Sequence, residues 1–275
     1  MTMSRRGSWY KTRVTIAVAS CAVMLFPLYW MVAVSFTSSR EVRSRSLRLW
    51  PSDPTLDNFR QLFDRFPVWT WFGNSVAIAV VVTLITVSFN LMAGYAFAQL
   101  RFRGSGVFFI VLLSTMMLPV QVIMVPQFEL VTRLGIYGTY WAVILPTAAS
   151  AFGIFLARQF IIGIPRELIE AARIDGAGHL RVFVSIVLPL CKPLIAVLTL
   201  LTVLSTWNDF AWPLIALKEN DLFTLPIGLL YLQGEFGADY GGIMAFALIS
   251  VLPMVVLFLA FQRYFVQGFS RSGIR

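Results

Sequence analysis

The chain has 275 residues, of which 58% are hydrophobic and only 13% are charged, and its mean hydropathy is +0.78. A soluble domain of this length carries about a quarter charged residues, so the composition excludes a single water-soluble core and predicts a membrane protein. The net charge of +9 is compatible with nucleic-acid binding, but basic residues on a membrane protein more often report its orientation. We therefore expect the lipid bilayer as a partner and no nucleic acid.

Six apolar stretches are long enough to cross about 30 Å of hydrocarbon as helices. They cover residues 14–36, 72–98, 107–130, 137–162, 187–210 and 241–266. The first stretch follows four basic residues, as in a signal peptide, but it is too long for one and five more stretches follow it. The prediction is therefore an all-α membrane protein with six transmembrane helices, in which a short segment, 1–13, precedes a single transmembrane domain, 14–275.

An even number of spans places both chain ends on the same side of the membrane, and the charges indicate which side. The N-terminus, the 99–106 loop, the 158–186 region, Lys192 and the C-terminus together carry a net charge of +11, whereas the other connections carry −2. The positive-inside rule therefore predicts cytoplasmic N- and C-termini. The 37–71 loop is an exception, because it holds six of the eight basic residues on the opposite side.

The predicted spans contain almost no ionisable side chains, which ion-driven transporters and proton pumps need at membrane depth. The single histidine, His179, lies in a polar stretch between spans. The sequence also contains no histidine-based zinc motif, no G-x-S-x-G nucleophile motif and no nucleotide-binding P-loop. We therefore expect no catalytic residue, no metal site and no cofactor bound by this chain, and we interpret it as a passive pathway that is driven from elsewhere.

The most informative segment, 163–193, is polar and lies between the fourth and fifth predicted spans. Residues 166–174 are rich in good helix formers, and Gly176 can adopt the left-handed conformation that ends a helix. A second short helix, from about His179 towards Pro189, is predicted to follow. The segment is thus predicted to be a helix–turn–helix at the cytoplasmic surface.

Two interpretations of the first helix are open at this point. Arg166 and Arg173 can pair with Glu170 at helical spacing, which would make the helix a simple amphipathic connector. Alternatively, Ala171 and Ala172 form a small-residue face beside the Glu170 carboxylate, and such a face can seat closely in a groove of another protein. The charge would then determine the register of docking more than its affinity.

A spaced set of residues in this segment resembles a known signature. The spacing EAA-x3-G-x9-I-x-L-P is formed by Glu170, Ala171, Ala172, Gly176, Ile186, Leu188 and Pro189. It resembles the signature of membrane permease subunits of ATP-binding-cassette importers. The fuller form, which includes Asp175, is similar to the carbohydrate-importer branch that contains the maltose and glycerol-3-phosphate systems. The resemblance covers nearly the whole chain, including the Trp-Asn-Asp-Phe sequence at 207–210.

This resemblance implies a type I importer permease fold with a cytoplasmic coupling helix in the region 163–186, between spans 4 and 5. In this family the helix docks into a cleft of an ATPase subunit. Glu170 would therefore contact the ATPase, Ala171 and Ala172 would pack in its cleft, and Gly176 would form the turn. Span 5 would begin at the bend marked by Pro189.

The resemblance also implies a set of partners. These are a second, different permease subunit, two copies of a cytoplasmic ATP-binding subunit and an extracytoplasmic solute-binding protein. ATP and Mg²⁺ would be bound by the ATPase subunits, and the assembly would lie in the bacterial plasma membrane. The implied solute is a sugar, a polyol or a glycerol-phosphate compound such as a glycerophosphodiester.

Polar residues in and beside the spans are candidates for lining a substrate pathway. We single out Gln121, Thr147, Ser150, Thr202, Asn208 and Asp209, with Asn90, Ser114, Thr199 and Ser205 as further candidates. Each has a structural alternative, because serine and threonine also hold helices together or bond to their own backbone. Helix capping explains Asn208 and Asp209 equally well.

A function from a different class is a stand-alone channel or facilitator for a small polar solute, with the signature match a coincidence. The two functions differ in their genetic setting. Neighbouring genes for an ATPase, a second permease and a secreted binding protein would identify the importer.

Overall fold

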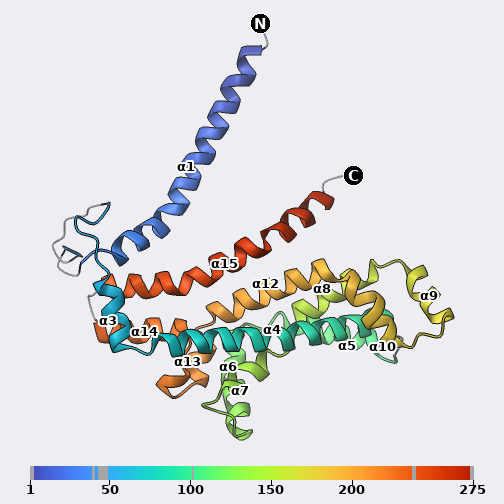
Figure 1. Cartoon of the computed structure of the whole chain (residues 1–275). Helices are drawn as coiled ribbons and strands as arrows, with labels where there is room; N and C mark the ends of the chain where they lie inside the picture. The colour runs from blue at the N-terminus through green and yellow to red at the C-terminus, as the bar shows by residue number, and fades with distance from the viewer. Residues whose placement is uncertain (1–2, 39–40, 43–48, 101, 237–239, 273–275) are drawn as a thin grey trace. The chain divides into compact units, whose positions relative to one another are not determined.

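The computed structural model describes residues 3–38, 41–42, 49–100, 102–236 and 240–272, and the regular structure within these ranges is entirely helical (Figure 1). Side chains are described from residue 10 to residue 262 within these ranges, apart from 235 and 236. The chain divides into two compact units, Met1–Val68 with Leu229–Leu252, and Trp69–Gly228 with Pro253–Arg275.

The main α-helices are α1 (Met3–Ser35), α3 (Asp57–Arg65), α4 (Val68–Gln99), α5 (Ser105–Thr115), α6 (Val120–Arg133), α7 (Tyr140–Ile144), α8 (Ala151–Ile162), α9 (Arg166–Ile174), α10 (His179–Val182), α11 (Leu188–Leu190), α12 (Lys192–Asn208), α13 (Ala211–Ala216), α14 (Leu225–Phe236) and α15 (Tyr240–Ser272). Short 3-10 helices follow α7 and precede α14, at Leu145–Thr147 and Asn220–Leu222, and a π-helical turn, Phe183–Val187, joins α10 to α11.

In the first unit, hydrogen bonds from a buried asparagine hold α3 against the end of α1. The side chain of Asn58 is only 3% exposed and donates two hydrogen bonds of 2.8 Å, to the carbonyl oxygens of Ser35 and Thr37. Leu62, one turn further along α3, is fully buried. Because leaving a buried polar group without partners costs about 1–3 kcal/mol, these bonds favour one orientation of α3 on α1.

In the second unit, α4 runs through two hydrophobic clusters. One cluster joins the C-terminal half of α4 to α8, α9, the α10–α11 segment and α12. The other joins the N-terminal half of α4 to α6, α7, α13 and the start of α14. Figure 1 accordingly shows α8 and α12 beside one part of α4 and α13 beside another. The long α4 helix is therefore the element that the two clusters of this unit share.

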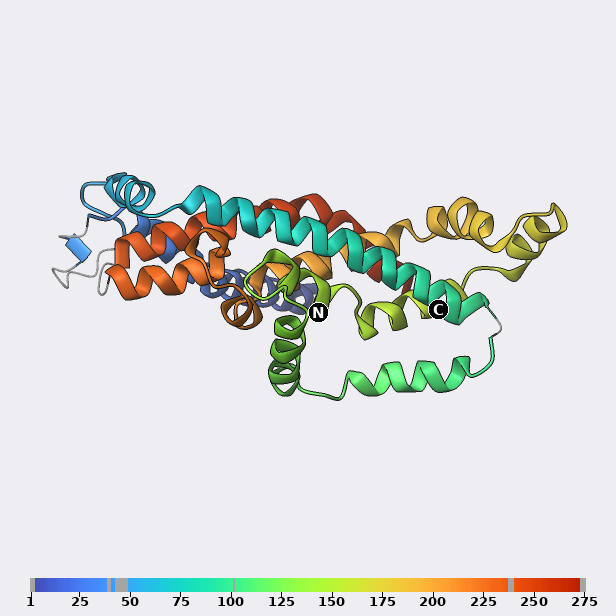
Figure 2. The same ribbon diagram turned by 90° about the horizontal axis from the view of Figure 1, so that it is seen from below.

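Among the described residues, three helices are long and apolar enough to cross a membrane alone: Tyr10–Ser35, Val68–Gln99 and Tyr240–Gln262. Three bent pairs reach that length and apolarity only when their two helices are taken together. They are α5 with α6, bent by 104°, Tyr140–Thr147 with α8, bent by 40°, and His179–Leu190 with α12, bent by 78°. Figure 2 shows α5 and α6 standing nearly at right angles. Each predicted span overlaps one of these helices or pairs.

Prolines explain two of the bends. α6 begins directly after Pro119, and a proline disfavours helical backbone at the residue before it. At the third bend, Pro193 has no N–H to donate to the carbonyl of Pro189, and the helix breaks at Cys191. The bend predicted at Pro189 therefore lies two residues later, and Pro189 itself is part of the short helix α11.

Candidate functional site

The helix α9 ends in a turn that favours glycine. Gly176 has a φ of +80°, and its N–H donates to the carbonyl of Arg173 at 3.0 Å. The N–H of Ala177 donates to the carbonyl of Ala172 at 2.9 Å. Together these two bonds form a Schellman motif, which satisfies carbonyls that a helix end leaves without partners. Gly176 thus ends the helix in the left-handed conformation that the sequence predicted.

One face of α9 packs on the molecule and the other is open. Ile169 is 3% exposed and belongs to the cluster on the C-terminal half of α4, and Ala172 packs against that cluster. Glu170 and Ala171 are exposed. The small-residue face is therefore divided, because Ala171 is free to meet a partner while Ala172 already contacts the chain's own core.

Large apolar side chains are also exposed around this helix. Ile174, the last residue of α9, is 87% exposed, and Leu180 on α10 is 77% exposed. Leu168 on α9 is exposed as well. Apolar side chains this open, beside a free carboxylate, form a surface suited to burial against another protein.

The ion pairs expected for Glu170 do not form. Neither of the ion pairs found among the described side chains, Arg60 with Asp57 and Arg133 with Glu129, involves it. Arg173 instead approaches Nδ1 of His179 at 3.3 Å. The interpretation of α9 as a connector held by local ion pairs therefore loses the contacts on which it depends.

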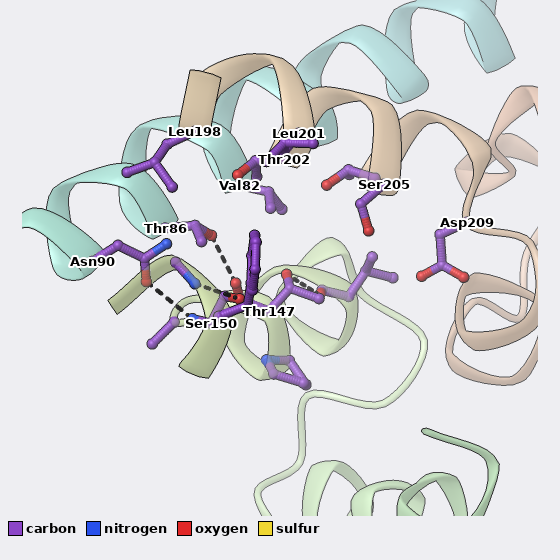
Figure 3. A pocket seen from close by; sticks show the side chains of 16 residues that line it. Val82, Thr86, Asn90, Thr147, Ser150, Leu198, Leu201, Thr202, Ser205 and Asp209 are labelled. Atoms are coloured by element: carbon purple, nitrogen blue, oxygen red, sulfur yellow. Dashed lines mark hydrogen bonds between the residues drawn. The ribbon is translucent and has the colours of Figure 1, made fainter. Parts of the chain in front are cut away.

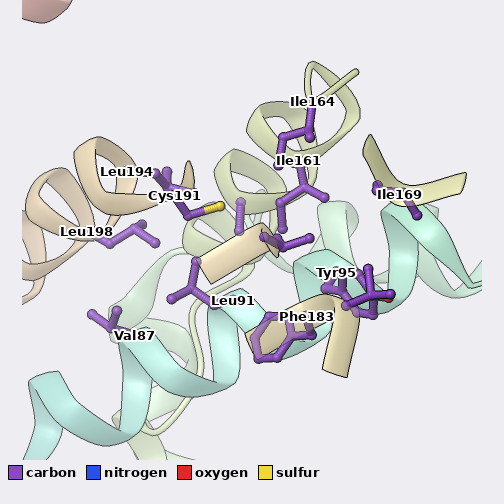
Figure 4. Close-up of a cluster of buried hydrophobic side chains, with 13 residues drawn as sticks. Val87, Leu91, Tyr95, Ile161, Ile164, Ile169, Phe183, Cys191, Leu194 and Leu198 are labelled. Atoms are coloured by element: carbon purple, nitrogen blue, oxygen red, sulfur yellow. The ribbon is translucent and has the colours of Figure 1, made fainter. Parts of the chain in front are cut away.

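The second short helix, α10, is tied to the end of α4. The hydroxyl of Tyr95 donates to the carbonyl of His179 at 3.3 Å and lies 3.5 Å from Nδ1 of the same residue. The ring of Tyr95 packs against that of Phe183, with 5.1 Å between the ring centroids. Figure 4 shows both rings in the cluster that also holds Ile169. Packed side chains therefore connect α9 and α10 to the end of α4.

The remaining signature residues lie around and beyond this junction. Asp175 is exposed at the end of α9, Ile186 is half-buried in the π-helical turn, and Leu188 and Pro189 open α11. Next to the junction is a cavity of about 520 Å³ lined by Ala98, Gln99, Leu100, Ile162, Arg166, Ile169, Glu170, Arg173 and His179. The structure thus brings Arg166, Glu170 and Arg173 of α9 to one opening beside the end of α4.

A separate cavity of about 380 Å³ lies between α4, the α7–α8 pair and α12, and we call it the polar cavity because half of its lining residues are polar. Eight of its lining residues are polar: Thr86, Asn90, Thr147, Ser150, Thr202, Ser205, Thr206 and Asp209. The other eight are Val82, Val143, Pro146, Ala149, Phe152, Gly153, Leu198 and Leu201. Figure 3 shows Thr202 and Ser205 on α12 across the cavity from Thr147 and Ser150, with Asp209 beyond Ser205 at one end.

Helical periodicity explains why these side chains meet. Thr86 and Asn90 are four residues apart on α4, and Thr202 and Ser205 are three apart on α12, with Asp209 four residues further on as the C-cap of that helix. Residues at such spacings lie on one face of a helix. Two polar stripes therefore face the same space.

The wall formed by α4 and α7–α8 is held by internal hydrogen bonds. Asn90 is 1% exposed, and its Oδ1 accepts a bond of 3.0 Å from the N–H of Ser150. The hydroxyl of Thr86 donates to the carbonyl of Thr147 at 2.7 Å, and the hydroxyl of Thr147 donates to the carbonyl of Val143 at 3.1 Å. The Nδ2 group of Asn90 packs against Gly153 and leaves no room for a Cβ atom there.

The structure gathers four of the six singled-out pathway candidates in this cavity: Thr147, Ser150, Thr202 and Asp209. Gln121 is exposed on α6 and does not line it. Asn208 also lies outside the cavity, and its amide donates to the carbonyl of Leu204 on its own helix at 2.8 Å. Of the further candidates, Asn90 and Ser205 line the cavity, whereas Ser114 and Thr199 do not.

Ten of the sixteen lining residues were not singled out from the sequence, among them Thr86, Phe152 and Thr206. The four-residue spacing of Thr86 and Asn90 was a usable signal, because both fall on one face of a long apolar helix. Phe152 carried no such signal, since the chain holds 24 phenylalanines and most apolar stretches contain one.

The connection between α13 and α14 is held against α4 by one side-chain amide and one indole. Nε1 of Trp71 donates to the carbonyl of Asn220 at 2.9 Å. Nδ2 of Asn74 donates to the carbonyls of Asp221 and Phe223 at 2.7 and 2.9 Å. These bonds therefore hold the charged connection against the first turns of α4.

Bent apolar helices, a cavity between them and an exposed short helix, α9, are together typical of a membrane permease subunit. Residues 90–271 match the family described as the binding-protein-dependent transport system inner membrane component, and the chain belongs to this family. It is a multi-pass inner-membrane protein and a transporter subunit, not an enzyme. The importer-permease function predicted from the signature at Glu170 is confirmed.

The chain is similar to named transporters over nearly its full length. It is 41% identical over 271 residues to the arabinooligosaccharides transport system permease protein AraQ of Halalkalibacterium halodurans, covering 98% of this chain and 96% of AraQ. It is 34% identical over 262 residues to the sn-glycerol-3-phosphate transport system permease protein UgpE of Escherichia coli O1:K1 / APEC, covering 92% and 93%.

A solved structure is also similar to this chain. It is the crystal structure of a bacterial ABC transporter involved in the import of the acidic polysaccharide alginate, with a TM-score of 0.84 and 24% identity. The match covers 96% of this chain and 98% of the other. This likeness shows the importer permease fold.

Proposed function

We propose that the chain is one of two different permease subunits in an ATP-driven bacterial importer for a sugar, a polyol or a glycerol-phosphate compound. In this proposal each bent helix pair crosses the membrane as one span, so that six spans place both termini in the cytoplasm and residues 14–275 form one domain. Two copies of a cytoplasmic subunit bind and hydrolyse ATP with Mg²⁺, and an external binding protein delivers the solute.

The exposed surface of α9 and α10 is the observation that carries the proposal. It combines the free carboxylate of Glu170 with the open side chains of Ala171, Ile174 and Leu180. Docking of this surface in the ATPase cleft would bury the apolar groups and give the carboxylate a partner. The contacts of Tyr95 would then pass the movement of the docked helix to α4.

The polar cavity supports the second half of the proposal. Its two polar stripes line a space between three helices that otherwise carry apolar side chains, and such a space suits a hydrophilic solute on its way through the membrane. The substrate classes come from relatives named for arabinooligosaccharides and for sn-glycerol 3-phosphate. The alternating-access movement would be a rocking of packed helices.

Glu170→Lys tests the coupling assignment in an importer reconstituted in lipid vesicles with both permeases, the ATPases and the binding protein. We expect loss of ATP-dependent uptake and weaker copurification of the ATPases, with unchanged membrane insertion. Glu167→Lys makes the same charge change in the first turn of α9, at a residue outside the cavity beside α4. We expect much less effect there.

Two results would contradict the proposal. Normal uptake by the Glu170→Lys importer would remove α9 from the coupling path. Uptake by the chain alone, without ATPases and without ATP, would instead support a stand-alone facilitator.

A further inference from the structure

We infer that the polar cavity between α4, α8 and α12 selects neutral polyhydroxylated solutes over anionic ones, and that Asp209 determines this specificity. The inference rests on the proposed function, because it treats the cavity as part of the solute pathway. Family membership leaves the point open, since the named relatives include both an oligosaccharide and a phosphate-ester transporter.

The charge of the cavity is the first argument. Asp209 is the only one of the sixteen lining residues with an ionisable side chain, and the lining contains no lysine, arginine or histidine. Asp209 is partly buried at one end of the cavity. A phosphate or carboxylate group entering this space would meet a negative charge with no compensating cation, and its repulsion is stronger away from bulk water.

The kinds of hydrogen-bonding groups are the second argument. Sugar hydroxyls both donate and accept hydrogen bonds, so a site for them needs both donors and acceptors. The hydroxyls of Thr202 and Ser205 can donate or accept hydrogen bonds, and Asp209 is an acceptor. This mixture suits neutral hydroxyl groups, whereas a dianionic phosphate needs donors and positive charge.

An aromatic ring supplies the third argument. Phe152, on α8, lines the same cavity and is 46% exposed. The C–H faces of sugar rings are apolar and pack well on exposed aromatic rings, while their edges form hydrogen bonds. The volume of about 380 Å³ also falls in the range of small-molecule sites, about 300–1,000 Å³.

A hydrogen bond made by Asp209 determines which substitution is informative. Its Oδ1 accepts a weak hydrogen bond of 3.5 Å from the N–H of Trp212 at the start of α13. Asn keeps a side-chain oxygen at this position and removes only the charge. Asp209→Asn therefore separates specificity from the local capping role better than Asp209→Ala does.

The test compares two solutes that differ at one terminal carbon. An arabinose oligosaccharide whose reducing end has been reduced to a neutral alditol and the same oligosaccharide oxidised there to a carboxylate both have an open terminal unit; they are supplied to the complete reconstituted importer, and the ratio of their uptake rates is measured. The same binding protein is used throughout, so its own preference cancels when the ratio for a variant is divided by the ratio for the unchanged importer.

We expect the unchanged importer to prefer the neutral solute. Asp209→Asn is expected to raise the relative uptake of the carboxylate solute roughly five- to tenfold. Ser205→Asp, which adds a second carboxylate to the cavity, is expected to lower it. Asn208→Asp is the matched control, because it places a carboxylate on the neighbouring residue outside the cavity, and it should leave the ratio unchanged.

The outcomes separate the inference from the proposed function. An unchanged ratio in Asp209→Asn and Ser205→Asp, or uptake of glycerol 3-phosphate in place of the oligosaccharide, would overturn the inference and leave the permease assignment intact. Absence of ATP-dependent uptake of every solute by the unchanged importer would count against the proposed function itself.

Discussion

The contact between α4 and α8 allows a sharp prediction about Gly94. A Cβ atom added at Gly94 would lie 2.5 Å from Cβ of Ala157 and 2.9 Å from the backbone nitrogen of Arg158. Carbon atoms in contact normally stay about 3.5–4.0 Å apart. Neither neighbour is the far end of a flexible side chain, so the helices themselves must separate.

Two opposing terms decide the effect of Gly94→Ala on stability. Overpacking of this kind costs about 1–3 kcal/mol, whereas replacing glycine by alanine inside a helix stabilises it by about 1 kcal/mol. Gly73→Ala provides the control, because Gly73 is in the same helix and an added Cβ there meets nothing within 4 Å. The difference between the two variants therefore isolates the overpacking cost.

The assay is thermal unfolding of the purified importer in detergent, at one scan rate for both variants, because membrane assemblies often unfold irreversibly. We expect Gly94→Ala to unfold several degrees below Gly73→Ala. Separation of the helices should also stretch the bond of 3.2 Å from Nε of Arg158 to the carbonyl of Phe97. Equal unfolding temperatures, or a higher one for Gly94→Ala, would refute the close approach of α4 and α8.

Two further predictions concern the coupling region. Gly176→Ala should accelerate hydrogen exchange at the C-terminal end of α9, because φ is +80° there and an L-residue pays about 1–2 kcal/mol in that conformation. Gly178→Ala, with open space around its Cβ and no positive φ, should leave the exchange rates unchanged. Tyr95→Phe keeps the ring against Phe183 but removes the bond to the carbonyl of His179. The loss of about 0.5–1.5 kcal/mol should speed exchange in α10 several-fold, and unchanged exchange would show that the hydroxyl does not hold this helix.

The coupling segment was predictable because its determinants are local in sequence. Helix formers at 166–174, a glycine at 176 and a second short helix after it are properties of neighbouring residues, and the structure has each of them. The absence of ion pairs between Glu170 and the other described side chains was not predictable in the same way. Arg173 finds His179 as a competing partner, and helical spacing alone does not reveal that competition.

The polar cavity was only partly predictable, because it depends on which helix faces meet. Residue type and position suggested Thr202 and Asp209, which line the cavity, but the same criteria suggested Asn208, which does not line it and bonds back to its own helix. Asn208 and Asp209 are neighbours in sequence at the end of α12, yet only Asp209 lines the cavity. The long-range packing of α4 against α8 and α12 makes that distinction, and it leaves no trace in the local sequence.

The π-helical turn at Phe183–Val187 has a consequence for the length of the chain between the coupling helix and the cavity. A π turn contains one residue more than an α turn, and each residue added to or removed from a helix rotates everything beyond it by about 100°. Deleting one residue in this turn would swing the stripe of Thr202, Ser205 and Asp209 away from α4, with every side chain still present. The number of residues between Gly176 and α12 is therefore constrained more tightly than the identities of those residues.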